Sequence, residues 1–455
     1  MNDITAFFAF LKYCLGYKEN MSRVIAGMNW HELYSFASKQ ALLGLCFEGI
    51  ERLGEEYPEE LKRNPIGREL LMTWMGKAQQ IRRQNMKVNA VASKLFAMLR
   101  VDGMRCCILK GQGNALMYPN PYSRTPGDID VWIDASRERI MEYAQKKFEL
   151  EDDIRLQHLE TSLDGVPVEL HFFPCSMNNP IYHARLQKWF RRNADLQCSH
   201  IVGLPDGAGD IAIPTTAFNV VYQLTHLYHH FFDEGIGMRQ IIDYFLVVND
   251  FSKNVFLNND LSNPSVNFSN HPVPLSKEGS TFSPSPSSSG SGDVTAPSRC
   301  SEPLRSKDGG PSKVSPDCAG WDRLAIEGDN SATAVTSSAS SALVVVQREL
   351  KYLGLWKFSG AVMYVLHEAL GLPEERMIAP MDEKRGKLLL AEILNGGNFG
   401  RHFTKYGHFT QQGMAKKYFL KIWRNMHFVR YFPAEALSEP IFRTWHFFWR
   451  LKHRR

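Results

Sequence analysis

Residues 124–133 read Arg-Thr-Pro-Gly-Asp-Ile-Asp-Val-Trp-Ile, which places two carboxylates in an otherwise apolar run. Successive side chains of a β-strand point to opposite faces, so Asp128 and Asp130 would share one face and the apolar residues between and beyond them the other. Two neighbouring carboxylates repel each other unless a positive charge lies between them. A hard divalent cation bound through oxygen atoms is the usual solution. The pattern therefore predicts a strand over 128–133 that binds metal.

Two other segments carry groups that suit the same chemistry. An apolar run ends at Leu109 and is followed by Lys110 and Gly111. The glycine lets the backbone approach a ligand closely, and the lysine offers a point charge for a phosphate. Further on, residues 166–173 alternate in polarity, so that Glu169 and His171 share a face. If this strand lies beside 128–133, three carboxylates converge, and they form the ligand set of a two-metal site for phosphoryl chemistry.

These residues resemble the polymerase-beta-like nucleotidyltransferase superfamily, and more closely a bacterial group of uncharacterised nucleotidyltransferase-family proteins. The resemblance is strongest over about residues 100–250. It rests on Leu109-Lys110-Gly111, Tyr118-Pro119, Arg124, Gly127-Asp128-Ile129-Asp130 and Glu169-Leu170-His171. It extends to a histidine-rich helix that is followed by Gly235, Gly237, Arg239 and Asp243.

The resemblance implies an enzyme that moves a nucleoside monophosphate from an NTP to a hydroxyl acceptor of unknown identity. Two Mg²⁺ ions, which Mn²⁺ can replace, would be the cofactors. The residues predicted to be catalytic and to bind the metals are Asp128, Asp130 and Glu169. Those predicted to bind the nucleotide are Lys110, Gly111, Arg124, Gly127, His171 and Arg239.

Several of these residues have a second interpretation. Arg124 either steadies a phosphate or pairs with an acid such as Asp128. Arg239 either contacts a phosphate or pairs with Asp243, four residues further along the same helix. His171 either orients Glu169 or a phosphate, or is a hydrogen-bonded core histidine. His226 and His230 share a helical face, where they either line the cleft or bind a transition metal.

Two other functions stay open. Gln112 replaces the serine or glycine of the classical motif, and the gap from Gly111 to Asp128 is long, so the chain could be a nucleotide-binding module without catalysis. A metal-dependent phosphohydrolase could use the carboxylates together with His226 and His230. A P-loop kinase is not expected, because Gly111-Gln112-Gly113 lacks the Lys-Ser/Thr that follows in that motif.

The predicted fold is α+β, with a small mixed nucleotidyltransferase sheet inside a mainly helical protein. Its strands are expected at 105–109, 128–133 and 166–173, with a further candidate at 156–163. Long helical patterns cover 69–99, 136–148, 214–232 and 343–370, the last with breaks at Gly354 and Gly360. The predicted segments are a helical region at 1–100, the core and following helices at 101–250, a disordered Ser/Pro/Gly-rich insertion at 251–340 and a helical region at 341–455.

Composition sets weaker limits. The net charge of +5 over 455 residues is too small to favour long nucleic acid as the acceptor, so a small molecule or a protein is preferred. The cysteines lack metal-ligand spacing and indicate reduced thiols. With no apparent signal peptide or transmembrane run, the expected location is cytoplasmic. The aromatic and basic tail 442–455 either packs on its own domain or contacts a membrane surface.

Overall fold

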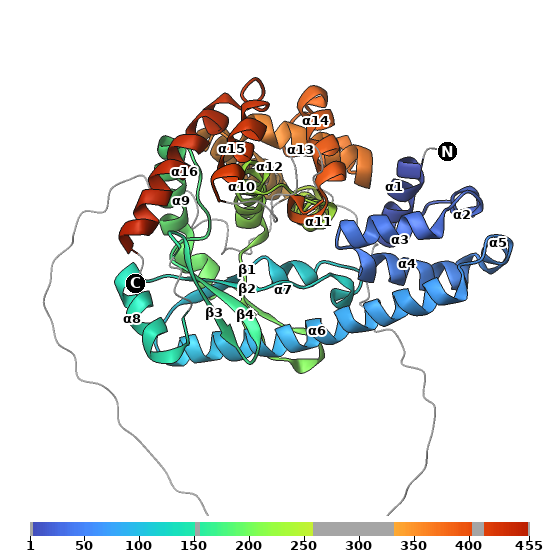
Figure 1. The fold of residues 1–455 in the computed structure, drawn as a ribbon, viewed down its shortest axis with the longest axis horizontal. Helices are drawn as coiled ribbons and strands as arrows, with labels where there is room; N and C mark the ends of the chain where they lie inside the picture. The colour runs from blue at the N-terminus through green and yellow to red at the C-terminus, as the bar shows by residue number, and fades with distance from the viewer. Residues whose placement is uncertain (1–2, 151–154, 258–331, 403–413, 454–455) are drawn as a thin grey trace, which may run out of the picture.

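The computed structural model of this chain describes residues 3–150, 155–257, 332–402 and 414–453. It is mainly helical and has one four-stranded mixed sheet, as the sequence predicts. Five N-terminal helices precede the long helix α6 (Arg68–Val101); they are α1 (Asp3–Cys14), α2 (Ser22–Ala26), α3 (Trp30–Lys39), α4 (Leu43–Glu56) and α5 (Pro58–Arg63). Figure 1 shows α6 running along the base of the molecule, from these helices to a position beneath the sheet.

The sheet has the order β1-β2-β4-β3. Its strands are β1 (Cys106–Leu109), β2 (Ile129–Ile133), β3 (His158–Leu163) and β4 (Val166–His171). Strands β2 and β4 run parallel, whereas β1 pairs with β2 and β3 with β4 in antiparallel fashion. The three strands expected from the sequence and the further candidate at 156–163 are therefore confirmed, and the two motif strands are neighbours.

The two faces of the sheet have different partners. On one face, Val131, Ile133 and Leu170 join a core that includes Leu95 of α6. On the other face, Trp132 stacks on Phe218, with 6.1 Å between the ring centroids. Because side chains alternate along a strand, the polar residues of the motifs share this second face. They are thereby directed toward the helices that follow the sheet.

The connecting elements agree with the predicted pattern. Ser136 caps the helix that follows β2, because its hydroxyl accepts a hydrogen bond from the backbone N–H of Arg139. The helices and strands that connect and follow the four-stranded sheet are α7 (Gly111–Ala115), α8 (Arg137–Lys147), α9 (Pro180–Ser199), β5 (Ile201–Gly203), β6 (Asp210–Ala212), α10 (Thr216–Asp233) and α11 (Met238–Leu257). Helix α10 covers the polar face of the sheet and carries the histidine cluster.

The C-terminal part is helical. Its helices are α12 (Ala332–Tyr352), α13 (Trp356–Leu370), α14 (Glu383–Gly396), α15 (Met414–Met426) and α16 (Pro433–His453). The predicted break at Gly354 is confirmed, but the one at Gly360 is wrong, because α13 continues through it. A Cβ at Gly360 would lie 2.8 Å from the carbonyl oxygen of Pro380, so this glycine permits close packing.

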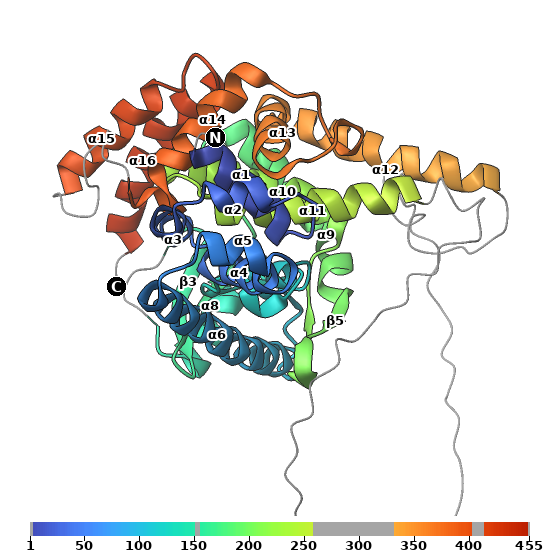
Figure 2. The same cartoon turned by 90° about the vertical axis from the view of Figure 1, so that its right-hand side faces the viewer.

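The predicted insertion needs correction at its ends. Residues 251–257 continue α11, and 332–340 begin α12. The remainder, 258–331, which contains the Ser/Pro/Gly-rich run, lies outside the described residues. Helices α11 and α12 lie side by side in both views (Figures 1 and 2). The division into four segments stays a prediction.

A buried carboxyl joins α16 to the loop after β4. Glu435 accepts hydrogen bonds from the backbone N–H groups of Asn178 at 2.6 Å and Asn179 at 3.3 Å. Burial raises the pKa of Glu435 to about 7, even though these two donors act to lower it. Since the folded-state pKa exceeds the unfolded one, protonation of Glu435 stabilises the fold below about pH 4.5, and this contribution is lost as the pH rises through about 7.

We therefore expect Glu435→Gln, which mimics the protonated acid, to raise the free energy of unfolding relative to the wild type at pH 8. The difference should be at most about 3 kcal/mol and should shrink toward pH 4.5. Urea unfolding of both proteins at a series of pH values measures it. A constant difference across the series would contradict the assignment of the titrating group.

Candidate active site

The polar face of the sheet brings the three predicted carboxylates to one cleft. Asp130 is the register partner of Glu169 across the parallel pair β2 and β4. Asp128 directly precedes β2. All three line a cleft of about 1510 Å³, including its open mouth, which is also lined by histidines of α10. The adjacency of the two strands that the convergence of these groups requires is thus present.

Two cations lie against the carboxylates. Lys110 Nζ is 3.1 Å from Asp130 Oδ1 and 2.7 Å from His226 Nε2. His171 Nε2 is 3.0 Å from Asp130 Oδ1 and 3.1 Å from Glu169 Oε2. Lys110 and His171 therefore contact the carboxylates directly, and His171 bridges two strands.

The charges are unevenly balanced within this cluster. Burial works to raise the pKa of Asp130, but Lys110 and His171 outweigh it and hold that pKa well below its usual range. Burial would lower the pKa of His171, yet Asp130 and Glu169 raise it to about 9. At Asp128, restricted access of water and then the charges of Asp130 and Glu169 raise the pKa to about 6. Asp128 is thus the carboxylate that most lacks a positive partner.

The uneven charge of the three carboxylates shows whether a divalent cation suits this site. The donor set at Asp128, Asp130 and Glu169 consists of carboxylate oxygens, which are the ligands that Mg²⁺ and Mn²⁺ prefer. A cation placed among them would remove the repulsion that raises the pKa of Asp128. The residues therefore fit the predicted metal chemistry.

Lys110 and Gly111 form the turn at the end of β1. Both have positive φ, +50° and +31° respectively. This conformation is rare for lysine, and it turns the chain sharply where the Lys110 side chain meets Asp130. Gly127 is exposed just before β2, and nothing lies within 4 Å of where its Cβ would be. Both glycines line a smaller pocket of about 530 Å³, which adjoins the cleft and shares Asp128 and Asp130 with it.

Arg124 pairs with a carboxylate, but not with Asp128. Its Nε and Nη2 donate to the two oxygens of Asp243, at 2.8 and 2.7 Å. Both side chains are buried, and Tyr118 also donates its hydroxyl to Asp243, at 2.8 Å. Asp243 thus pairs with Arg124 rather than with Arg239, the other pairing considered from the sequence. The Arg124–Asp243 pair joins α11 to the segment before β2.

Arg239 lies beside this pair. Its Nη1 donates to the carbonyl of Thr125 at 3.2 Å, while its buried Nε has no hydrogen-bond partner within the described part of the structure. Burial and then the charge of Arg124 lower the pKa of Arg239. Both arginines line the smaller adjoining pocket together with Asp128. Two guanidinium groups therefore lie near a single buried carboxylate, Asp243, and only Arg124 makes a bidentate pair with it.

The histidines of α10 lie as their spacing predicts. His226 Nε2 and His230 Nε2 are 3.1 Å apart, and both side chains line the cleft. Burial, and then the charge of Lys110, lower the pKa of His226 well below its usual value. A neutral His226 can accept the hydrogen bond that Lys110 donates.

Sequence reasoning missed several residues of the cleft, among them His158 and Phe399. His158 on β3 is the register partner of His171, and its alternation with Glu160 was the available signal. Phe399 comes from a distant loop, where its ring lies 5.4 Å from that of His230 and 5.8 Å from the guanidinium carbon of Arg239. Only the glycines around Phe399 mark it in the sequence, and they indicate a loop rather than a site.

A mixed sheet whose adjacent strands carry three carboxylates beside a lysine is the arrangement expected of a nucleotidyltransferase. A family model described as an uncharacterised nucleotidyltransferase matches residues 26–262. Since this is more than half of the chain, the protein belongs to that family. No curated protein and no solved structure matches the chain.

Proposed function

We propose that this protein transfers a nucleoside monophosphate from an NTP to a hydroxyl group of an acceptor, with loss of pyrophosphate. The observation that carries the proposal is the register of β2 and β4, which pairs Asp130 with Glu169 two residues beyond Asp128. Family membership supports transferase chemistry of this kind. We expect the acceptor to be a small molecule or a protein.

The proposed division of labour follows the charges in the cleft. Asp128, Asp130 and Glu169 would hold two Mg²⁺ ions, for which Mn²⁺ can substitute. When bound, the ions supply charge stabilisation to the transferring phosphoryl group. Glu169, on a separate strand from the two aspartates, is our choice for the group that takes the acceptor proton.

The remaining residues would hold the nucleotide. Lys110 and Arg239 contribute positive charge, and the orphan Nε of Arg239 is available to an anion. Arg124 keeps one nitrogen, Nη1, without a hydrogen bond in the described part of the structure. Gly111 and Gly127 let the backbone approach the phosphates. His171, which contacts both Asp130 and Glu169, would fix the orientation of these carboxylates.

Calorimetric titration with each of the four NTPs, with and without Mg²⁺, tests this proposal. We expect the wild type to bind an NTP in a Mg²⁺-dependent manner and the Asp128→Asn/Asp130→Asn variant to lose that binding. A matched control is Asp210→Asn, which changes an exposed aspartate on β6. Binding without any transfer to added hydroxyl compounds would instead favour a non-catalytic module. Release of nucleoside monophosphate without an acceptor would favour a phosphohydrolase.

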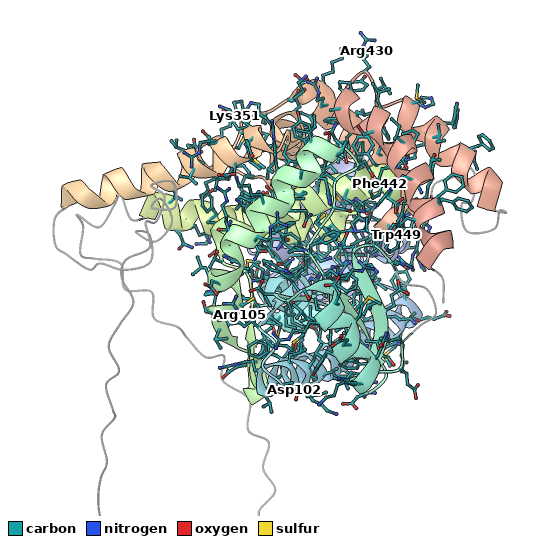
Figure 3. All side chains as sticks on the ribbon, turned by 90° about the vertical axis from the view of Figure 1, so that its left-hand side faces the viewer. Asp102, Arg105, Lys351, Arg430, Phe442 and Trp449 are labelled. Carbon is teal, nitrogen blue, oxygen red and sulfur yellow. The ribbon has the colours of Figure 1, made fainter. Side chains whose placement is uncertain are left out.

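The C-terminal helices bear on the alternative that the aromatic and basic tail contacts a membrane surface. Among the described residues, no helix combines the length and the apolar character needed to cross a bilayer. However, α15 and α16 expose apolar side chains at helical spacing; they are Phe419, Trp423 and Met426 on α15 and Leu437, Ile441, Trp445 and Phe448 on α16. Figure 3 shows α16, marked by Phe442 and Trp449, at the edge of the molecule.

The charge of this segment favours an anionic partner. Residues 414–455 contain ten lysines and arginines against two glutamates, a net of +8, whereas the whole chain carries +5. Exposed aromatic side chains combined with positive charge are typical of helices that lie on anionic lipid. We propose that α15 and α16 contact the surface of an anionic membrane.

Co-sedimentation with vesicles tests this contact. We expect binding to vesicles that contain acidic phospholipid, weaker binding at high salt, and about a tenfold or greater loss for Ile441→Ser/Phe448→Ser. Ile181→Ser, at an exposed position on α9, is the control. Equal binding by both variants would contradict the proposal, as would dimerisation of the wild type through this face in light scattering.

A further inference from the structure

Strands β3 and β4 bring two histidines and a glutamate together at the floor of the cleft. Their antiparallel register pairs His158 with His171 and Glu160 with Glu169, so the side chains of all four point to the same face. His158 Nδ1 lies 3.3 Å from Glu169 Oε2, and His171 Nε2 lies 3.1 Å from the same oxygen. One donor atom from each of His158, Glu169 and His171 lies within 4.8 Å of the others.

These separations suit a common metal ligand shell. Bonds of about 2.1 Å from a metal ion to nitrogen or oxygen put neighbouring donor atoms about 3.0–3.4 Å apart. Both measured contacts to Glu169 Oε2 lie in or near this range. Three protein ligands on one side of an ion, with the cleft on the other, leave a coordination position open, as in catalytic metal sites.

His158 supplies an independent indication. It is 9% exposed, yet neither ring nitrogen makes a hydrogen bond within the described part of the structure. A buried imidazole without hydrogen bonds costs free energy, and a metal bond from Nδ1 would remove that cost. Its Nε2 lies 3.5 Å from Glu160 Oε1, which in turn is 2.7 Å from Arg155. A carboxylate on the far nitrogen is the usual support of a histidine that binds metal.

His171 already occupies a position where positive charge is needed. Its Nε2 lies between Asp130 and Glu169. A metal ion that replaced the proton on Nε2 would therefore contact the same two carboxylates. The other nitrogen, Nδ1, is 3.3 Å from the side-chain amide of Gln157. An amide can present its nitrogen or, after a half-turn, its oxygen, and can therefore serve either tautomer of the imidazole.

We propose that His158, Glu169 and His171 bind a first-row transition metal ion of the Zn²⁺ or Fe²⁺ type. Imidazole donors favour such ions over Mg²⁺, which prefers an all-oxygen shell. The site rests on the proposed function only in that it shares Glu169 with the carboxylate cluster. The cleft thereby has two unlike ends: an oxygen-rich end at Asp128 and Asp130, and an end with two imidazoles toward β3.

Co²⁺ is a suitable probe, because its visible absorption changes in position and strength when protein ligands replace its octahedral shell of water. The full chain is stripped with a chelator and titrated with Co²⁺ in the presence of excess Mg²⁺. We expect the wild type to bind one ion with a visible absorption band, and His158→Ala to weaken that binding by about a hundredfold or more. His229→Ala, which removes a nearby cleft histidine outside the cluster, should leave the titration unchanged.

Three outcomes would overturn the proposal: no Co²⁺ band in the wild type, equal binding by His158→Ala, or loss of the band in His226→Ala, which would place the ion on α10. Thermal unfolding verifies that His158→Ala is folded, and His158→Asn replaces it if it is not. Asp128→Asn separates this site from the proposed function. That variant should retain Co²⁺, whereas wild-type protein that binds Mg²⁺–NTP but no Co²⁺ would refute the transition-metal site alone.

Discussion

Asp128→Asn is expected to lower nucleotidyl transfer by on the order of a thousandfold or more, while the fold stays intact. Removing one preorganised charged contact from a transferring phosphoryl group or oxyanion lowers the rate by about this factor. Asp128 lines the cleft and directly precedes β2, so its side chain lies outside the paired strand. Asparagine keeps the shape of the side chain and removes only the charge, so the loss should fall on metal-assisted chemistry.

The same substitution should slightly raise the melting temperature of the metal-free protein at pH 8. At that pH Asp128 is ionised, and the nearby charges of Asp130 and Glu169 oppose it. Activity and stability are therefore expected to move in opposite directions, which a misfolded variant would not produce. Turnover of a radiolabelled NTP and differential scanning calorimetry measure the two, with Asp210→Asn as the control. Unchanged turnover would refute the assignment of Asp128.

The sequence predicts the sheet well because the signal is local. A strand with one buried face repeats every two residues, so the alternation around Asp130 and Glu169 identifies both the strands and the polar face. The adjacency of β2 and β4 follows once the carboxylates are required to meet, whereas their parallel direction is known only from the structure. Helix ends that have a local capping residue, such as Ser136, are equally predictable from the sequence. Gly360 was misread because close packing, rather than a turn, explains that glycine.

The partners of the site residues were not predictable, because they lie far apart in the chain. Arg124 and Asp243 are 119 residues apart in the chain, and no local sequence pattern around either residue predicts their pairing. Phe399 reaches the cleft from a loop after α14. His158 is different: its strand was expected, and the register with β4 would have placed it opposite His171. The sequence did not show that β3 pairs with β4, and only the three-dimensional structure supplies that pairing.

The buried pair of Arg124 and Asp243 should dominate the stability of this region. Asp243→Ala would leave a guanidinium group that is 4% exposed without its bidentate partner, and Tyr118 without its acceptor. Removing one member of a buried ion pair costs about 3–5 kcal/mol, because the remaining charge stays desolvated. Urea unfolding should therefore show a loss of this size in the free energy of unfolding.

A surface pair provides the matched control. Arg105 pairs with Asp195, and both side chains are exposed. Asp195→Ala should therefore cost less than about 1 kcal/mol. The double variant Arg124→Leu/Asp243→Leu should recover part of the loss seen in Asp243→Ala, because it buries no unpaired charge. If Asp243→Ala proved as mild as Asp195→Ala, Arg124 would not depend on Asp243, and its guanidinium would be free to serve the nucleotide alone. A large loss with partial recovery would instead mean that Asp243 holds Arg124 in place, and that Arg239 is the arginine left to meet a phosphate.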